Sequence, residues 1–146
     1  MTDMHTKEVR SYNMSRIRSK NTKPEELVRK YLFSKGLRYR KNDKRYPGHP
    51  DIVLPKYHTI VFVHGCFWHL HNGCRYAVMP STNVEFWSNK LNTNKLRDKR
   101  TKSALEAMGW NVLIVWECQL RKDVREYTLQ KLYNSILQAD PPKSRL

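Results

Sequence analysis

Long apolar runs are absent from the sequence. No stretch approaches the roughly 20 consecutive apolar residues that a membrane-spanning helix needs. The first residues also lack the apolar core of a secretory signal peptide. These two absences predict a cytoplasmic protein that has no membrane partner.

Acidic residues are scarce as well. The 146 residues include 13 Asp and Glu against 28 Lys and Arg, which gives a formal net charge of +15. Residues 1–49 supply more than half of this excess. The imbalance predicts a polyanionic partner, with nucleic acid ahead of an acidic membrane surface. A basic face that serves solubility alone is the alternative.

Cysteine occurs three times, an odd number that argues against a disulfide framework in a reducing compartment. The thiols are then either metal ligands or free. Repeats and low-complexity tracts are also absent. The length suits one domain with its own core. We therefore expect a basic DNA-contacting arm over residues 1–21, one domain over residues 22–140 and a tail over residues 141–146.

Metal-binding side chains are concentrated in residues 61–74, which read VFVHGCFWHLHNGC. The β-branched and aromatic residues 59–63 predict a strand, and Gly65 marks its end. Three thiolates and one imidazole can surround one ion in a closed, four-coordinate site that suits zinc. The predicted ligands are Cys66, His71, Cys74 and the distant Cys118. The alternative is that the cysteines are small buried apolar residues.

A hairpin is predicted directly after the Pro-Gly turn at residues 46–50. Strands over residues 51–54 and 59–64, joined by a turn, bring Asp51 close to Val63 and His64. Mg²⁺ takes few protein oxygens and keeps several waters, so the Asp51 carboxylate and the Val63 backbone carbonyl are candidate ligands. His64 is placed to contact a phosphate or to order a water. A turn cap is the alternative role for Asp51.

A helix is predicted to begin after Thr22. Thr22 and Glu25 have the spacing of a capping box, Pro24 suits the first turn, and Gly36 ends the helix. Glu25 is most simply a capping residue. Its second interpretation is a carboxylate that faces a catalytic metal site.

A long second helix is predicted from the loop at residues 79–83 to Met108. Its apolar face includes Trp87, Leu91, Leu105 and Met108. Asp98 lies on the same face although it is charged, and a carboxylate that faces inward needs a partner. His69 is the candidate, because a carboxylate that fixes the tautomer of an imidazole makes it a better proton carrier.

The remaining elements complete an α/β fold. Residues 110–116 form a nearly continuous apolar run, which predicts a buried central strand in a sheet that is covered on both faces. A final helix is predicted from Arg121 to a point before Pro141. We therefore expect a central mixed β-sheet flanked by helices.

Two apolar residues stand out in the basic arm. Met14 and Ile17 lie three residues apart, beside Arg16 and Lys20, and can share one face of a short helix. They predict either a staple onto the core or a wedge that enters a DNA groove, with the basic side chains on phosphates.

Several of these motifs together resemble the very short patch repair endonucleases. They are Asn13-Met14, residues 22–25, PGHPD at 47–51, HGCFWH at 64–69, EFW at 85–87 and residues 109–118. The resemblance runs from residue 5 to residue 120, and HGCFWH is a highly specific signature. It implies a restriction-endonuclease-like fold, with residues 22–140 as the nuclease domain.

The resemblance also implies an activity. Members of this family nick one strand of duplex DNA on the 5′ side of the thymine in a T:G mismatch, which arises when 5-methylcytosine is deaminated. Asp51 and the Val63 carbonyl would hold the catalytic Mg²⁺. His69, paired with Asp98, would act as general base or acid, and His64 would support the phosphate. The cysteine and histidine set would hold a structural zinc.

Phe67 and Trp68 resemble the aromatic wedge that such enzymes insert beside the mismatch, with Met14 and Ile17 pressing from the other groove. Stacking on an aromatic ring returns roughly 1–3 kcal/mol per base, and a mismatched step is more easily deformed. Core packing over the zinc loop is the alternative role for both rings. We expect a monomer, with mismatch-repair proteins and a cytosine-5 methyltransferase system as functional partners.

Two other functions remain open. One is a nickase of broader mismatch specificity, or a restriction-type nuclease. Restriction-like nucleases more often carry an acidic residue and a lysine where this chain has Phe62 and His64, which favours the repair enzymes. The other is a basic zinc module that binds DNA without cutting it.

Overall fold

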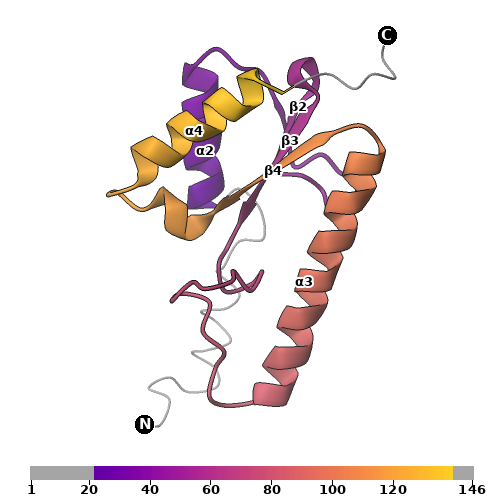
Figure 1. Ribbon diagram of the computed structural model, residues 1–146, viewed down its shortest axis with the longest axis vertical. Coiled ribbons are helices and arrows are strands. Elements are labelled where there is room, and N and C mark those ends of the chain that lie inside the picture. The colour runs from indigo at the N-terminus through magenta and orange to yellow at the C-terminus, as the bar shows by residue number, and fades with distance from the viewer. Residues whose placement is uncertain (1–21, 140–146) are drawn as a thin grey trace.

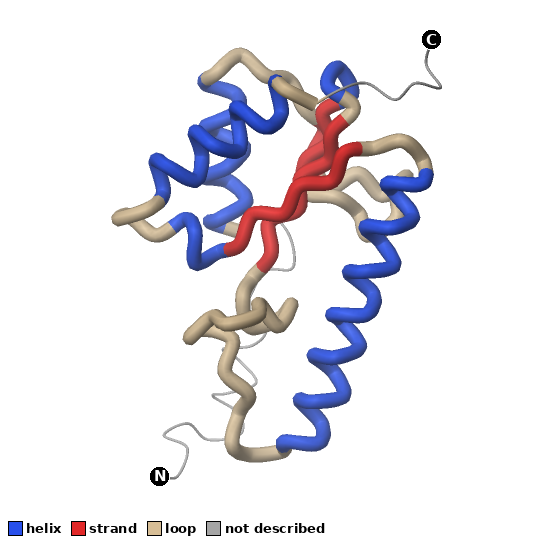
Figure 2. The backbone as a smooth tube through the Cα atoms, viewed as in Figure 1, coloured by secondary structure: helices blue, strands red, loops and turns tan. Residues whose placement is uncertain are grey.

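A mixed sheet of four strands, in the order β1-β2-β3-β4, organises residues 22–139, the part of the chain that the computed structural model describes (Figures 1 and 2). The elements are α2 (Lys23–Ser34), β1 (Arg40–Lys41), β2 (Ile52–Leu54), η1 (Pro55–Tyr57), β3 (Thr59–His64), α3 (Val84–Ala107), β4 (Asn111–Trp116), η2 (Glu117–Leu120) and α4 (Arg125–Leu137). This arrangement confirms the predicted α/β class and the mixed sheet.

The predicted hairpin forms the centre of the sheet. β2 runs antiparallel to β3, with Ile52 opposite Val61. The connection is one 3₁₀ turn that ends at His58, whose φ of 52° lets the chain reverse direction. β4 runs parallel to β3 and aligns Trp116 with His64, so the last residues of both strands lie side by side.

The prediction that residues 110–116 form a central strand is wrong. Among the described residues β4 pairs with β3 alone and lies at the edge of the sheet. The burial pattern agrees, because Val115 is its one fully buried residue. An apolar run indicates cover on both faces of a strand, and helices supply that cover here. The apolar run does not indicate whether the strand has a hydrogen-bonded neighbour along each of its two edges.

Helices cover both faces of the sheet, as Figure 1 shows. α2 and α4 lie on one face, where a core of aliphatic residues from both helices packs on Ile52, Leu54 and Val61. α3 lies on the other face and packs through Leu105 on Ile60. Odd and even residues of β3 therefore serve different cores, as the alternation of a strand requires. His64, an even residue, faces the side of α3.

Two of the three predicted helices begin where the sequence indicates, whereas the helix predicted from Arg121 begins at Arg125. Thr22 and Glu25 form both bonds of the capping box at the start of α2. In α3, Leu91 and Leu105 are fully buried, but Met108 is 52% exposed and lies beyond the helix end. The prediction that Met108 belongs to the apolar face is therefore wrong. The N-terminal part of α3 extends beyond the sheet and runs beside the loop of residues 65–83 (Figure 2).

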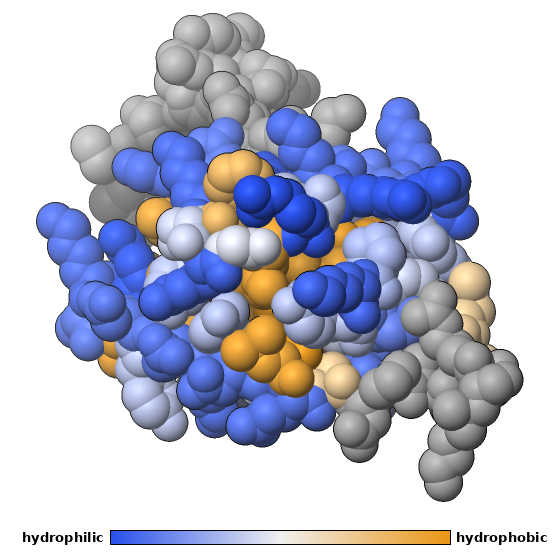
Figure 3. Space-filling view, turned by 90° about the horizontal axis from the view of Figure 1, so that it is seen from above, coloured by the Kyte–Doolittle hydropathy of each residue, from blue (hydrophilic) through white to orange (hydrophobic). Residues whose placement is uncertain are grey.

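The surface of residues 22–139 is mostly polar on the face drawn in Figure 3. No helix in this part of the chain is long and apolar enough to span a membrane. The face seen in Figure 3 carries mostly hydrophilic side chains around a small apolar group. Met14, Arg16, Ile17 and Lys20 lie outside the described residues, as does the tail from residue 140.

Candidate active site and metal cluster

A cavity of about 580 Å³ opens between α3 and the ends of the central strands. All five side chains predicted to serve catalysis line it, namely Glu25, Asp51, His64, His69 and Asp98. Lys44, Arg97 and Lys102 also line it and bring positive charge. Carboxylates and imidazoles within a basic rim suit a phosphodiester substrate, because the cations attract the phosphate and the inner groups can move protons.

Asp51 is held by the backbone of β3. Its Oδ2 atom accepts a 2.7 Å hydrogen bond from the N–H of Val63. The N–H and C=O groups of one strand residue point to the same neighbouring strand, so the Val63 carbonyl also faces the Asp51 side. Burial, together with the nearby Glu25 carboxyl, raises the pKa of Asp51 to about 7. Two close, buried carboxyl groups form a place where a divalent cation would relieve repulsion.

Glu25 combines its two predicted roles. Its Oε2 atom accepts hydrogen bonds from the Thr22 hydroxyl, at 2.8 Å, and from the Thr22 backbone N–H. Oε1 lies 3.7 Å from the Arg29 guanidinium. The side chain is 3% exposed and still lines the cavity beside Asp51. The cap therefore also fixes a carboxylate next to the candidate Mg²⁺ ligand.

His64 is a buried imidazole that faces the cavity without a hydrogen bond at Nδ1. Among the described residues this nitrogen has no partner, although the residue is only 6% exposed. The ring stacks on His69, with centroids 3.8 Å apart and planes within 4°. Burial and the neighbouring His69 lower the pKa of His64 to about 4. A buried nitrogen without a partner is costly and suggests a ligand contact.

His69 and Asp98 form the predicted pair. Nδ1 of His69 donates to Oδ2 of Asp98 over 2.6 Å. Asp98 projects from α3, while His69 follows Phe67 and Trp68 in the loop after β3. When Nδ1 carries the shared proton of a neutral imidazole, Nε2 is left as an acceptor. The geometry therefore leaves His69 able to take a proton inside the cavity.

Two further side chains of α3 hold the loop, and neither was predicted to do so. Asn94 donates from Nδ2 to the Trp68 carbonyl at 3.1 Å, and Lys95 donates to the Asn72 side chain at 2.7 Å. Asn94 lies one helical turn before Asp98. The sequence did contain a signal for Asn94. Its i, i+4 spacing from Asp98 places the side chains of Asn94 and Asp98 on the same face of α3, the face that meets the loop.

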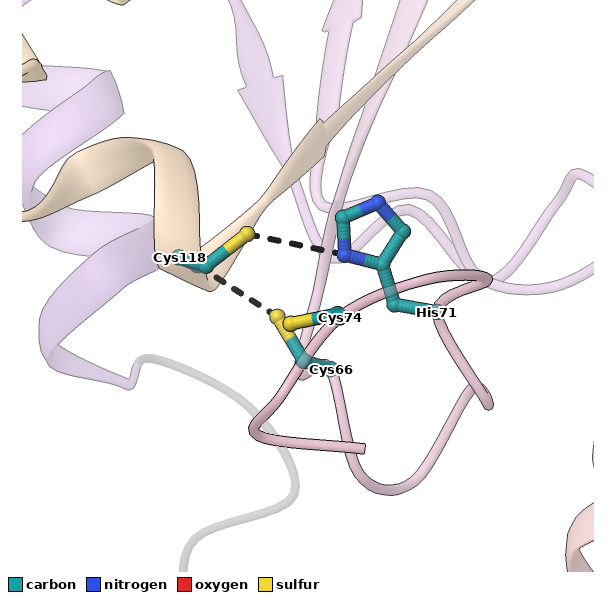
Figure 4. Close-up of side chains that lie close together, drawn as sticks. All are labelled: Cys66, His71, Cys74 and Cys118. Atoms are coloured by element: carbon teal, nitrogen blue, oxygen red, sulfur yellow. Dashed lines mark hydrogen bonds between the residues drawn. The ribbon is translucent and has the colours of Figure 1, made fainter. Parts of the chain in front are cut away.

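The predicted zinc ligands lie together, as Figure 4 shows. Donor atoms of Cys66, His71, Cys74 and Cys118 are all within 4.8 Å of one another. The Cys118 N–H donates to Sγ of Cys66 at 3.4 Å, and its own Sγ lies 3.5 Å from Nδ1 of His71. Burial raises the pKa of the Cys66 thiol to about 12. A thiol this reluctant to ionise in an apolar setting becomes a thiolate when a cation binds.

The predicted aromatic wedge packs against the start of α3. Phe67 and Trp68 are half-buried, and their rings lie 5.0 Å apart. Trp87 of α3 contacts both, at 5.5 and 5.9 Å between centroids, and was not predicted to belong to this group. The rings pack on each other, yet both keep part of their surface open to solvent.

Comparisons with known proteins identify a family of DNA endonucleases. The sequence profile described as DNA mismatch endonuclease Vsr matches residues 2–75. The Type II nicking enzyme V.NmeAIP of Neisseria meningitidis is 50% identical over 140 residues, which cover 95% of this chain and 99% of that protein. V.XorIIP of Xanthomonas oryzae, also a Type II nicking enzyme, is 49% identical over 82% of this chain and 88% of its own.

The DNA mismatch endonuclease Vsr of Escherichia coli is 45% identical over 83% of this chain and 77% of its own. Cavity and comparisons together define an endonuclease that nicks DNA. The chain belongs to the DNA mismatch endonuclease Vsr family.

Proposed function

We propose that this enzyme nicks duplex DNA on the 5′ side of the thymine in a T:G mismatch and that it requires Mg²⁺. The observation that carries the proposal is the meeting of Asp51, His64 and the His69–Asp98 pair in one basic-rimmed cavity. The resemblance of the sequence to the very short patch repair endonucleases supports the choice of mismatch. Deaminated 5-methylcytosine is the source of that lesion.

Each residue has a defined task in the proposed hydrolysis. Asp51, with the Val63 carbonyl and Glu25 nearby, would hold Mg²⁺, which supplies a positive charge that stabilises the phosphorane-like transition state. The Nε2 atom of His69 takes a proton from the attacking water, while Asp98 holds the ring in the required tautomer. His64 presents its ring to the phosphate that is cut.

The cluster of three cysteines and His71 is proposed to hold a structural zinc ion. Its donor set is soft, four in number and leaves no open position, as in structural rather than catalytic zinc sites. The mixed sheet with helices on both faces suits a restriction-endonuclease-like fold. Residues 22–140 would then be the nuclease domain, and residues 1–21 its DNA-contacting arm.

Phe67 and Trp68 are proposed to enter the duplex beside the mismatch. They directly precede His69, so a base step opened by these rings lies next to the proton acceptor. Met14 and Ile17 would press from the opposite groove, and Arg16 and Lys20 would contact phosphates. We propose a cytoplasmic monomer that works with mismatch-repair proteins and a cytosine-5 methyltransferase.

A nickase with broader mismatch tolerance, or a restriction-type nuclease, is the second candidate. The names of V.NmeAIP and V.XorIIP, both Type II nicking enzymes, support it more directly than they support T:G specificity. The family description retains the word mismatch. A zinc module that binds DNA without cutting is disfavoured by the cavity and by these relatives.

Digestion of a substrate panel separates the candidates. Duplexes with T:G, the other mismatches and no mismatch are incubated with enzyme and Mg²⁺, with Asp51→Asn as the inactive control. We expect nicking of T:G at least tenfold above every other duplex, a discrimination of about 1.4 kcal/mol. Equal nicking of several mismatches would establish the broader candidate, and an uncut panel would refute both.

A further inference from the structure

Trp116 contacts the catalytic cavity through His64. It is the last residue of β4 and lies opposite His64, the last residue of β3. The indole meets the imidazole edge to face, with centroids 5.2 Å apart and planes at 74°. Neighbouring residues in this register point to the same face of the sheet. The contact is therefore a direct product of the parallel pairing.

The same indole contacts the metal cluster. It stacks on the ring of His71, with centroids 4.0 Å apart and planes within 6°. Nδ1 of His71 lies 3.5 Å from Sγ of Cys118, which follows Trp116 by two residues. The Trp116 backbone is fixed as well, because its N–H donates to Oε1 of Gln119 at 3.0 Å. One side chain thus touches an imidazole in each of the two sites.

His64 depends on such packing for its orientation. Its Nδ1 has no hydrogen bond among the described residues, so no polar partner there fixes the plane of the ring. Aromatic contacts hold it instead, through the stacked ring of His69, the indole of Trp116 and the more distant, tilted ring of Phe62. Aromatic pairs of this kind have preferred geometries and stabilise beyond the burial of area alone. The loss of one of them would allow His64 to rotate.

We propose that Trp116 is a positioning residue that couples the metal cluster to the cavity. His71 and Cys118, as ligands of a bound ion, would hold the indole in place, and the indole would hold His64 against the phosphate. The inference rests on the proposed function of His64 and extends it. A metal site that stabilises the fold then also sets the geometry of the reaction.

Nicking kinetics with three variants test the proposal. Trp116→Leu removes the flat ring, and Trp116→Phe keeps an aromatic surface. Trp110→Leu is the matched control. Trp110 directly precedes β4, at the opposite end of the strand from Trp116, and its ring stacks on His58 with centroids 4.1 Å apart, away from the cavity and the metal cluster. Loss of outer contacts of this kind costs about 10–100-fold. We expect that loss in kcat for Trp116→Leu, with KM little changed, and substantial recovery in Trp116→Phe.

A spectroscopic measurement is independent of activity. Exchange of Zn²⁺ for Cd²⁺ lengthens the metal–sulfur bonds and keeps the cluster filled. The ring resonances of His64, assigned with a His64→Asn variant, should shift on this exchange in the wild type. The shift should be much smaller in Trp116→Leu, where the connecting ring is gone.

The outcomes separate this inference from the proposed function. If the wild type nicks and Trp116→Leu retains kcat within threefold, or if Trp110→Leu loses as much at equal thermal stability, the coupling is refuted. Equal Cd²⁺-induced shifts in the wild type and Trp116→Leu would also refute it. Failure of the wild type to nick any duplex would refute the proposed function, while the resonance test would still decide the coupling.

Discussion

Nδ1 of His69 and Oδ2 of Asp98 lie 2.6 Å apart, although the two residues come from a loop and a helix. Both side chains are partly exposed, at 28% and 26%, so the pair lies at the wall of the cavity. A short contact between an imidazole and a carboxylate fixes both the rotation and the tautomer of the ring. Its value to catalysis can be measured by changing one atom.

Replacing Asp98 with Asn should lower kcat. The amide can donate to Nδ1 and thereby favour the wrong tautomer, so Nε2 no longer accepts a proton. We expect a loss of about 10–100-fold in kcat, as for other groups that orient a reacting side chain, with little change in DNA affinity. Single-turnover nicking and a binding titration measure the two quantities.

Glu106→Gln is the matched control for this variant. Glu106 is an exposed carboxylate on the same helix and forms a 3.9 Å ion pair with Lys102. It should nick at the wild-type rate. A wild-type rate for Asp98→Asn as well would show that the pair does not serve the reaction.

Asp51→Asn should stabilise the enzyme when Mg²⁺ is left out. Burial and Glu25 raise the pKa of Asp51 to about 7, while Arg29 and the Val63 N–H act in the other direction. A carboxyl whose pKa is raised in the folded state destabilises the fold increasingly as pH rises from its ordinary pKa of 3.8 to its folded-state pKa of about 7. The variant cannot ionise, so its advantage in Tm should grow from pH 5 to pH 7.5, to on the order of several degrees.

Asp43→Asn provides a control of opposite sign. Arg45 lowers the pKa of Asp43 to about 2, so the ionised carboxylate stabilises the fold at every pH above its ordinary value of 3.8. This variant should melt below the wild type by a nearly constant amount between pH 5 and pH 7.5. An Asp51→Asn protein that melts below the wild type at pH 7.5 would show that the ionised Asp51 carboxylate does not destabilise the fold.

Removal of the metal from the cysteine cluster should unfold the loop of residues 65–83 and abolish nicking. Structural zinc contributes on the order of 10 kcal/mol in small zinc domains, and His69 lies in the same loop. Zinc content, thermal melting and nicking are measured after chelation and dialysis. Re-addition of Zn²⁺ should restore the zinc content and the thermal melting, and it should restore nicking when the assay contains Mg²⁺. Re-addition of Mg²⁺ alone should restore none of the three. Unchanged melting after complete removal of the metal would show that the cluster is not structural.

Phe67→Ala and Trp68→Ala should weaken discrimination between mismatched and paired duplex. Stacking by such a ring contributes about 1–3 kcal/mol per base, and a paired step costs more to open. We expect a roughly 5-fold or greater loss in affinity for T:G duplex, with affinity for paired duplex almost unchanged. Fluorescence anisotropy with both duplexes measures this, and Phe33→Ala, an exposed ring on α2, is the control. Equal losses on both duplexes would favour a packing role.

Much of the site follows from residues that are close in the sequence. The hairpin fixes Asp51 opposite the end of β3 because the connecting turn is short and the strands alternate. The capping box of Thr22 and Glu25 is likewise local. The more distant Cys118 was predicted as a fourth donor of the right kind for zinc, and the pairing of His69 with Asp98 was predicted from a carboxylate on the apolar face of a helix. The resemblance to a known family implies the same residues.

The contacts of β4 and α3 could not be predicted in this way. Nothing in residues 110–116 states that the strand is an edge or that it runs parallel to β3, because both depend on the path of α3. The position of Trp116 between His64 and His71 follows from that pairing. Asn94 and Trp87 are ordinary helix residues until the loop of residues 65–83 packs beside them.

The central claim is strand-specific hydrolysis at a T:G mismatch, and sequencing of cut ends tests it most directly. A library of T:G duplexes with randomised flanks and a matched T:A library are digested with Mg²⁺, and both strands are sequenced. We expect nicks on the thymine strand, immediately 5′ to the mismatched thymine, within a limited set of flanks. Cuts in both strands, or cuts that are as frequent in the T:A library, would contradict the claim.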